Sequence, residues 1–240
     1  MVHSVHIVNV AIHAIAGGLG LATGVVPLLS LKGGPAHRTF GRMFVAFAGM
    51  ALAAAFSLEA LFSQAAWIYP ATLAVTYQYF GGLRSLALKG KRPGVLDAMA
   101  ALIALGAFAG LYQALGGPWS RAGSLNAPVA GALGWVALVA VYDLTRPLWA
   151  LTWTTRLRPL DHGLKMTGAF FAMASAGGGN LFKGFQPWSQ IGPLVLGFAV
   201  MALMAGLWAA RRPISTGDWG DERGTRSGPG RSGALRSSRR

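Results

Sequence analysis

The chain has 240 residues, of which 53% are apolar and only 12% charged, whereas a soluble domain of this length carries about twice that share of charge. A net charge of +14 would suggest nucleic acid in a soluble protein, but here the basic residues fall in alternate connections between apolar runs and in the tail, as in a membrane protein. The absence of cysteine excludes disulfides, thiolate metal sites and covalently attached c-type haem.

Apolar runs of about twenty residues recur along the chain and predict an all-α polytopic membrane bundle of about seven transmembrane helices. A helix of this length crosses about 30 Å of hydrocarbon, because it rises about 1.5 Å per residue. Only helices satisfy their own backbone polar groups there, and the runs are too long for barrel strands. The expected spans are residues 6–31, 40–62, 66–88, 95–115, 129–149, 164–182 and 190–210.

Lysine and arginine set the expected orientation. The connections after the first, third and fifth spans are basic, whereas the opposite side contains only Arg121 and Lys183. Because cytoplasmic loops are enriched in Lys and Arg, the N-terminus is expected outside and the C-terminus in the cytoplasm, with the protein in the cell (inner) membrane. Tryptophans stand at the expected outer and inner boundaries, as in aromatic belts: Trp67, Trp119 and Trp188, and Trp149, Trp153 and Trp208.

Two parts of the chain differ in composition. Residues 1–210 form the expected seven-span membrane domain, and residues 211–240 contain Gly, Ser, Arg and acids with almost nothing apolar. Such a segment cannot bury a core, so it predicts a disordered basic cytoplasmic tail. The expected partners are the lipid bilayer and anionic headgroups on the basic side, worth about 1 kcal/mol per basic residue near the surface, and not nucleic acid.

Polar residues inside a membrane are costly and are candidates for function. The outer-side candidate cluster is His6, His13, Glu59 and Asn180. A pair formed by a histidine and a carboxylate there would bind a metal, carry protons or simply satisfy itself. A zinc site needs three or four ligands, and this group offers few groups that could serve as ligands.

The inner-side candidate cluster is His37, Arg38, Arg42 and His162, and Asp97, Asp143, Asp161 and Lys165 are expected on the same side. His37 and His162 stand at the cytoplasmic mouths of two spans that run in the same direction, which is the geometry of a bis-histidine haem b. The alternative is an ordinary solvated histidine at each helix start, paired with a neighbouring acid. His13 cannot join them, because the helix from His13 to Leu29 spans about 24 Å.

Small residues form stripes on several expected spans, notably Gly17, Gly20 and Gly24 on the first and Gly106 and Gly110 on the fourth. Such stripes predict close helix packing. Two familiar seven-span classes are excluded: the last span lacks the lysine of a retinal protein, and too few histidines share one depth for a zinc hydrolase. No phosphate-binding or nucleophile motif is present, so enzyme activity stays open.

Three blocks of sequence point to a family. The first is 13–17 (HAIAG) with Gly24, 32–34 (KGG) and 37–42 (HRTFGR); the second is 77–84 (YQYFGGLR); the third is 161–170 (DHGLKMTGAF) with Asn180. Together they resemble a widespread bacterial family of multi-span inner-membrane proteins whose domain has no assigned function. The third block departs from the family form, since Gly163 stands where a bulkier residue is common. The resemblance implies an inner-membrane protein and places His13, His37 and His162 on family positions, but it implies no substrate.

The sequence therefore favours a multi-pass integral membrane protein of unassigned activity, of a ligand-binding or transport type with polar intramembrane clusters. One alternative is a membrane redox protein that binds haem b through His37 and His162. The other is a structural or assembly partner in the membrane.

Overall fold

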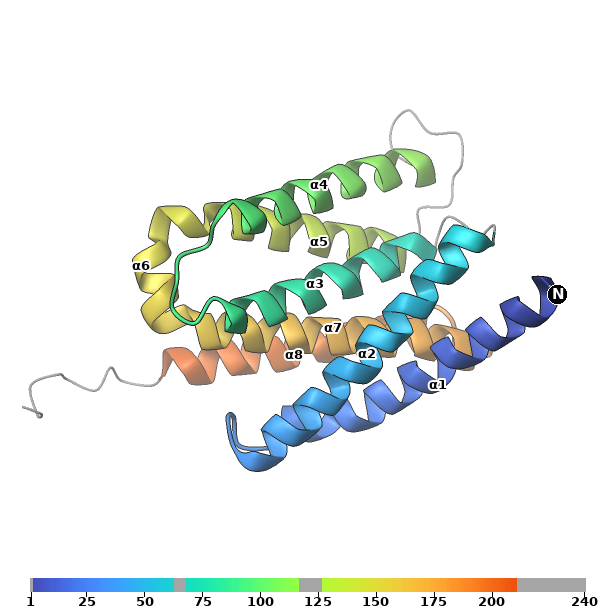
Figure 1. Cartoon of the computed structure of the whole chain (residues 1–240), viewed down its shortest axis with the longest axis horizontal. Helices are drawn as coiled ribbons and strands as arrows, with labels where there is room; N and C mark the ends of the chain where they lie inside the picture. Colours follow the sequence, from blue (N-terminus) through green and yellow to red (C-terminus); the bar gives the residue numbers. More distant parts are fainter. Residues whose placement is uncertain (1, 63–67, 117–126, 211–240) are drawn as a thin grey trace, which may run out of the picture.

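The computed structural model describes residues 2–62, 68–116 and 127–210 (Figure 1). Within these ranges the chain is helical and contains no strand, which confirms the all-α expectation. The seven long helices there are α1 (Val2–Leu29), α2 (Pro35–Leu61), α3 (Tyr69–Ala87), α4 (Val95–Leu115), α5 (Ala127–Thr145), α7 (Arg158–Leu181) and α8 (Trp188–Ala209). The expected tail at 211–240, Trp67, Trp119 and Arg121 lie outside the described residues.

Five helical stretches are long and apolar enough to cross a membrane: residues 3–29, 35–61, 95–115, 127–181 and 188–209. The fourth stretch holds both α5 and α7, because the chain reverses through short helical turns rather than an open loop (Figure 1). Helix α3 is long enough but too polar to qualify, since it carries Tyr77, Gln78 and Arg84. These stretches indicate a membrane protein, and seven crossings remain a prediction.

Prolines and glycines set several helix boundaries. Helix α2 starts at Pro35, five residues before the expected start of its span, because proline suits the first turn of a helix. Gly33 before it has φ +78°, a conformation that glycine adopts without strain and that permits the tight reversal between α1 and α2. Lys32 caps the preceding helix, since its Nζ donates to the carbonyl oxygens of Pro27 at 2.7 Å and Leu28 at 2.9 Å.

The reversal between α5 and α7 consists of three short helical segments: η2 (Arg146–Trp149), α6 (Ala150–Thr152) and the π-helical η3 (Trp153–Leu157). Helix α5 ends at Thr145, just before the Arg146-Pro147 pair, because a residue preceding proline is disfavoured in the α conformation. The expected fifth span continued to Trp149, so its end is corrected by four residues. Helix α7 starts at Arg158 rather than at 164, with Pro159 in its first turn.

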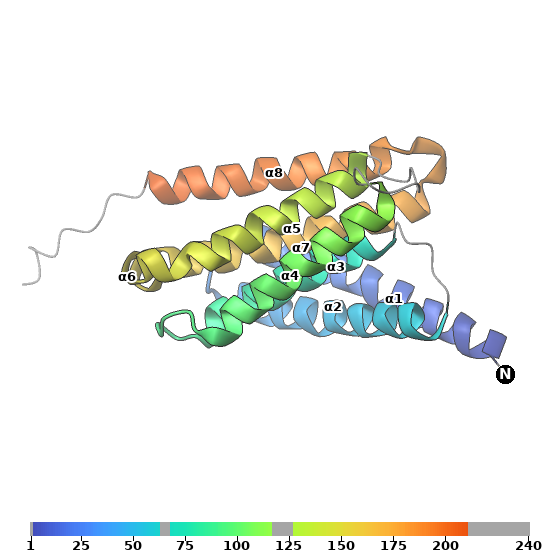
Figure 2. The same cartoon turned by 90° about the horizontal axis from the view of Figure 1, so that it is seen from above.

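The helix ends gather at two ends of the molecule (Figures 1 and 2). The α1–α2 turn, the α3–α4 turn, α6 and the C-terminal end of α8 lie towards the left of Figure 1, and the N-terminus lies at the opposite end. We call the first of these the basic end, because its connections contain Lys32, Lys89, Lys91, Arg92, Arg146 and Arg156. In the described part of the opposite end, the α7–α8 connection contains Lys183.

Helices α3, α4 and α5 share an apolar core, in which Ala74, Ala101 and Val136 are almost fully buried. A second core joins α2 to α7 through Phe44 and Phe170, whose ring centroids are 6.1 Å apart. Gly24 of α1 lies against both of these rings, where an added Cβ would overlap them. The α1–α2 hairpin therefore meets the rest of the bundle mainly through α1 and this aromatic contact.

The two expected glycine stripes differ in whether they pack against a neighbouring helix. Gly20 and Gly24 contact neighbouring helices, which supports close packing of the first stripe, although no described atom comes within 4 Å of a Cβ built at Gly17. The stripe predicted at Gly106 and Gly110 is wrong as a packing surface within the described part of the chain, because a Cβ at either position would meet open space within 4 Å. Both residues lie on a face of α4 that the rest of the described chain leaves uncovered.

Candidate functional site

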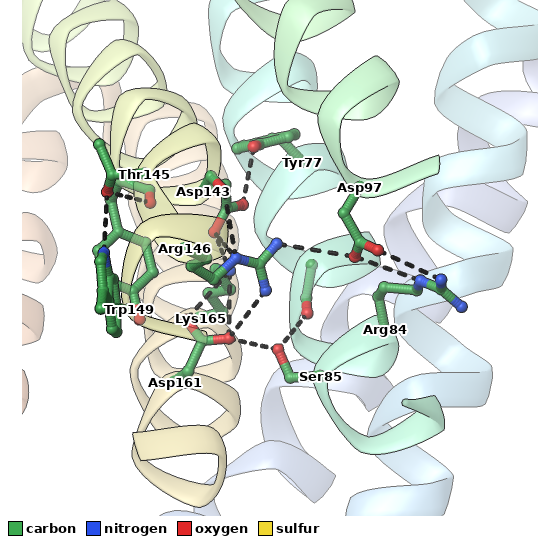
Figure 3. Close-up of polar contacts among 12 residues, drawn as sticks. Tyr77, Arg84, Ser85, Asp97, Asp143, Thr145, Arg146, Trp149, Asp161 and Lys165 are labelled. Atoms are coloured by element: carbon green, nitrogen blue, oxygen red, sulfur yellow. Dashed lines mark hydrogen bonds and ion pairs between the residues drawn. The ribbon is translucent and has the colours of Figure 1, made fainter. Parts of the chain in front are cut away.

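Six charged side chains meet between α3, α4, α5 and α7 beside the chain reversal (Figure 3). We call them the charge cluster: Asp97, Asp143, Asp161, Arg84, Arg146 and Lys165. The chain has 7 acidic residues, three of which lie in residues 211–240. Three of the four acidic residues outside that segment therefore lie together in the charge cluster. Separate, solvated carboxylates would not be expected to do so.

Arg146 is the centre of the charge cluster. Its side chain is 2% exposed and approaches all three aspartates, with Nε 3.1 Å from Asp143 Oδ1, Nη2 3.7 Å from Asp97 Oδ1 and Nη1 3.6 Å from Asp161 Oδ2. The guanidinium also lies 5.0 Å from the ring of the fully buried Trp153, in cation–π geometry. One cation is thus shared among three carboxylates, each from a different helix.

Lys165 forms the second link. Its Nζ lies 2.6 Å from Asp143 Oδ1 and 3.1 Å from Asp161 Oδ1, and its side chain is 4% exposed. It also lies 5.4 Å from the ring of Tyr142. Lys165 and Asp161 are four residues apart on α7, so they share one helix face, and Asp143 meets them from α5.

Asp97 and Arg84 form the part of the cluster nearest to solvent. Arg84 of α3 donates from Nε and Nη2 to the two oxygens of Asp97 at 3.3 and 3.2 Å. Asp97 also accepts a hydrogen bond from the Gly94 backbone at 2.9 Å, and so caps the start of α4. The Arg84 side chain is 26% exposed, whereas that of Asp97 is 2% exposed. Solvent therefore reaches the cluster at Arg84.

Hydroxyl groups complete the coordination of the carboxylates. Tyr77 donates to Asp143 Oδ2 at 2.8 Å, Ser85 donates to Asp161, and Tyr142 also hydrogen-bonds to Asp161. Deeper along α3, the buried Gln78 accepts a hydrogen bond from Trp135 Nε1 at 2.8 Å. The Gln78 amide lies against Gly168, where a Cβ would overlap it. A string of polar groups thus continues from the cluster into the bundle.

The local sequence explains how the cluster forms. Asp143 and Arg146 are three residues apart at the end of α5, and the reversal turns α7 back so that Asp161 and Lys165 face them. The charges balance, with three acids against three bases. Removing a carboxylate or an ammonium group from water costs several kcal/mol even in a protein, so each ion here depends on its partners. Adding one proton to any of the aspartates would leave one base in excess.

The predicted inner-side residues lie around this cluster rather than in it. His37 Nδ1 donates to the carbonyl oxygen of Pro27 at 3.1 Å, and His162 Nδ1 donates to that of Gly82 at 2.9 Å. Both imidazoles are half-buried. Each is tied to a different neighbouring helix, His37 to α1 and His162 to α3.

The two predicted arginines are placed differently. Arg38 and Arg42 are exposed, and Arg38 Nε donates to the carbonyl oxygen of Gly33 at 2.7 Å. Neither arginine contributes to the ion pairs of the charge cluster. The three aspartates expected on the same side pair with Arg84, Arg146 and Lys165.

The predicted outer-side residues form a looser group. Glu59 accepts a hydrogen bond from Thr72 at 2.7 Å and interacts electrostatically with His13, whose Nδ1 donates to the carbonyl oxygen of Ala51 at 2.9 Å. His6 is stacked edge-on against Phe62, with ring centroids 4.6 Å apart. His6, His13 and Glu59 thus line the contact of α1 with α2.

Asn180 does not join that group, because it is exposed and its amide donates to the Ala176 carbonyl one turn earlier. Among the described residues, no three His, Asp or Glu side chains converge as a metal site.

Sequence reasoning missed Arg84, Arg146 and the hydroxyl groups of the cluster. In the sequence, both arginines resemble the basic residues of cytoplasmic connections, which indicate only the orientation of the protein. The available signal was the spacing of an acid and a base, three residues apart at 143 and 146 and four apart at 161 and 165, inside strongly apolar surroundings. Such spacing indicates pairs held within a helix face rather than charges in a loop.

Comparison of the chain with protein-family models, with curated proteins and with solved structures finds no match. The family resemblance of the three sequence blocks therefore stays a prediction.

Proposed function

We propose that the chain is a seven-span membrane protein of ligand-binding or transport type, in which the charge cluster responds to protons. The observation that carries this proposal is the convergence of three aspartates on two arginines and one lysine in a chain with five membrane-length helical stretches. Ionisable groups at membrane depth are expensive, and they are functional candidates for that reason. The proposed location is the inner membrane, with the basic end in the cytoplasm beside anionic lipid headgroups.

The pairing of Arg146 supports a switching role. Its contacts with Asp97 and Asp161 are 3.7 and 3.6 Å long, and its Nη1 is buried without a hydrogen-bond partner. A purely structural ion pair is expected to have short contacts that satisfy every donor. A guanidinium held loosely by several carboxylates can shift towards those that remain charged when one of them is protonated. Helices α4, α5 and α7 would then change their relative positions.

Proton access is expected from the basic end. Arg84 is the most exposed member of the cluster, and its partner Asp97 contacts the buried Arg146. A proton arriving at Asp97 would therefore disturb the pairing of Arg146 directly. The hydroxyl of Tyr77 and the amide of Gln78 supply polar groups further into the bundle.

The test needs no known substrate. The protein is reconstituted in liposomes on a solid-supported membrane, and the transient current after a pH jump is recorded. The wild type should give a current that the charge-balanced double variant Arg84→Met/Asp97→Asn loses, because the carboxyl group proposed to take up the proton is removed together with its partner. Lys183→Met, at an exposed site on the opposite end, is the matched control and should behave like the wild type.

A wild-type current no larger than that of protein-free liposomes would overturn the proposal. It would leave the structural alternative, in which the cluster only holds helices together. That alternative predicts that the double variant is less stable than the wild type and that the pH jump moves no charge in any variant.

A further inference from the structure

Asp97 lies between two guanidinium groups at the start of α4 (Figure 3). Arg84 donates from Nε and Nη2 to its two oxygens at 3.3 and 3.2 Å, and Nη2 of Arg146 lies 3.7 Å from its Oδ1. Two N–H groups that pair with two carboxylate oxygens are the arrangement in which arginine recognises carboxylates. The chain itself therefore shows that a carboxylate fits between these two side chains.

Both guanidinium groups also have donors that Asp97 does not use. Nη1 of Arg146 is buried and has no hydrogen-bond partner in the described part of the chain, and the side chain is 2% exposed. Arg84 has five N–H donors, and its described hydrogen bonds use only Nε and Nη2. Its side chain is 26% exposed, so a solute can reach it. An unpaired donor on a buried cation is unfavourable, and it points to an acceptor from outside the chain.

The charges around this position favour an anion over a cation. Residues 84–97 contain four basic side chains and a single acid, Asp97. Lys89, Lys91 and Arg92 are exposed in the turn before α4, and they form no ion pair with an acid in the described ranges. Their field raises the concentration of anions where solvent reaches the charge cluster, and lowers that of cations.

The charge balance of the cluster links the binding of an anion to protonation. With all three aspartates ionised, three acids face three bases. A proton on Asp97 leaves two acids against three bases, and an uncompensated buried charge is strongly unfavourable. A solute carboxylate at Arg84 and Arg146 would restore the balance. Proton uptake and anion uptake are therefore expected to favour each other.

We propose that Arg84 and Arg146 bind a small monocarboxylate when Asp97 is protonated, so that the solute handled by the protein is a monocarboxylate taken up together with a proton. The assignment rests on the proton response proposed above and names the solute that accompanies it. While Asp97 is ionised, its own carboxylate occupies the donors of Arg84. A proton on either oxygen of Asp97 releases those donors to the solute.

Other groups of the cluster could also take up a proton, and the test must separate them from Asp97. Asp143 and Asp161 lie on the far side of Arg146 and also contact Lys165, whereas Asp97 contacts the more exposed Arg84. Besides the two arginines, the titratable and charged groups in and beside the cluster are Tyr77 on α3, Tyr142 and Asp143 on α5, and Asp161, His162 and Lys165 on α7.

The first experiment compares two variants of the full-length protein in detergent. Asp97→Asn leaves two acids against three bases at any pH at which Asp143 and Asp161 are ionised, and asparagine still suits a helix start. Arg84→Met/Asp97→Asn is the matched control, because it leaves two of each. Formate replaces a bulky sulfonate at constant ionic strength, and the shift in the midpoint of thermal unfolding reports binding. Asp97→Asn should bind formate at least about tenfold more tightly than the double variant. Equal shifts would overturn the proposal.

The second experiment tests the wild type, which keeps Asp97. The shift caused by formate should grow as the pH falls from about 8 to about 5, because protonation of Asp97 releases the donors of Arg84. Asp97→Asn should lose this pH dependence, whereas Lys183→Met should keep it. Chloride at the same concentration should shift the midpoint less, since a sphere does not match the fork of a guanidinium group.

The outcomes separate the solute from the proton response. A wild type that formate stabilises equally at both pH values, or not at all, would overturn the monocarboxylate proposal even if the pH-jump current is present. A pH dependence that persists in Asp97→Asn would do the same, because another group would then take up the proton. A missing pH-jump current would instead overturn the transport proposal and would leave the binding of formate unchanged.

Discussion

At the scale of single residues, Asp143 is the carboxylate nearest to both buried cations of the charge cluster, Lys165 and Arg146. Lys165, Arg146 and Tyr77 approach its two oxygens at 2.6, 3.1 and 2.8 Å. Its side chain is 3% exposed, so water contributes little to stabilising its charge. The stability of the cluster therefore depends strongly on whether Asp143 and Lys165 are present together.

Asp143→Asn and Lys165→Met should each lower the free energy of unfolding by about 3–5 kcal/mol, because each leaves the buried cluster with one uncompensated charge. The double variant should cost at least about 1 kcal/mol less than the sum of the two single changes. Equilibrium unfolding in detergent measures all three values. Strict additivity would show that the two groups do not interact in the folded protein.

Tyr77→Phe removes a single hydrogen bond to the Asp143 carboxylate and leaves the ring in place. We expect a loss of about 1.5–3 kcal/mol in unfolding free energy, as for a hydrogen bond to a charged group. The loss should shrink to about 0.5–1.5 kcal/mol in the Asp143→Asn/Lys165→Met background, where a neutral amide oxygen replaces the charged acceptor. An equal loss in both backgrounds would assign the effect to packing of the ring.

The residues of the cluster were only partly predictable. The three aspartates and Lys165 were identified, because acids and amines inside apolar runs stand out in the sequence. Arg84 and Arg146 were not, because a basic residue at a helix end looks the same whether it faces the cytoplasm or turns inwards. For Arg146, the direction depends on the reversal through η2, α6 and η3, and no local sequence pattern predicted that reversal.

At the scale of the helices, Gly24 lets α1 lie directly against the rings of Phe44 and Phe170. A Cβ at Gly24 would lie within 3 Å of the rings of Phe44 and Phe170, whereas a Cβ at Gly17, on the same helix, would meet nothing within 4 Å. These two residues therefore separate the packing role of a small residue from its effect on the helix itself.

Gly24→Ala should lower the midpoint temperature of unfolding in detergent, because the two rings must move apart to admit the methyl group. Gly17→Ala should leave the midpoint unchanged or raise it, since alanine is the better helix former. If both substitutions had the same effect, α1 would not be held against these rings.

The order and the identity of the apolar stretches were predictable from the sequence, and the ends of the helices were not. The start of α2 at Pro35 and of α7 at Arg158 differ from expectation by five and six residues, because the helices extend beyond the apolar run into polar turns. Hydropathy locates the part of a helix that suits lipid, whereas proline and backbone hydrogen bonding decide where the helix begins.

At the scale of the whole molecule, the alternation of helix ends is consistent with the orientation proposed from Lys and Arg. The α3–α4 connection at the basic end and the α7–α8 connection at the opposite end should lie on different sides of the membrane (Figure 1). Both contain an exposed lysine, Lys91 and Lys183, which can be replaced in a chain that has no cysteine.

Lys183→Cys should react with a membrane-impermeant maleimide in intact cells, and Lys91→Cys should react only after the membrane is opened. Mass shift of the purified protein measures both reactions. The reverse pattern would invert the proposed orientation. Equal labelling of the two sites from outside would contradict the alternation and the count of seven spans.

The electrical balance of the charge cluster has a consequence for a protein in an energised membrane. Three negative and three positive groups sum to zero, so the transmembrane voltage exerts no net force on the cluster as a unit. One bound proton changes that sum to +1, and a single charge moving across 100 mV changes in energy by about 2.3 kcal/mol. In the proposed proton response, a voltage that is negative inside draws the protonated cluster towards the cytoplasm and exerts no net force on the unprotonated one.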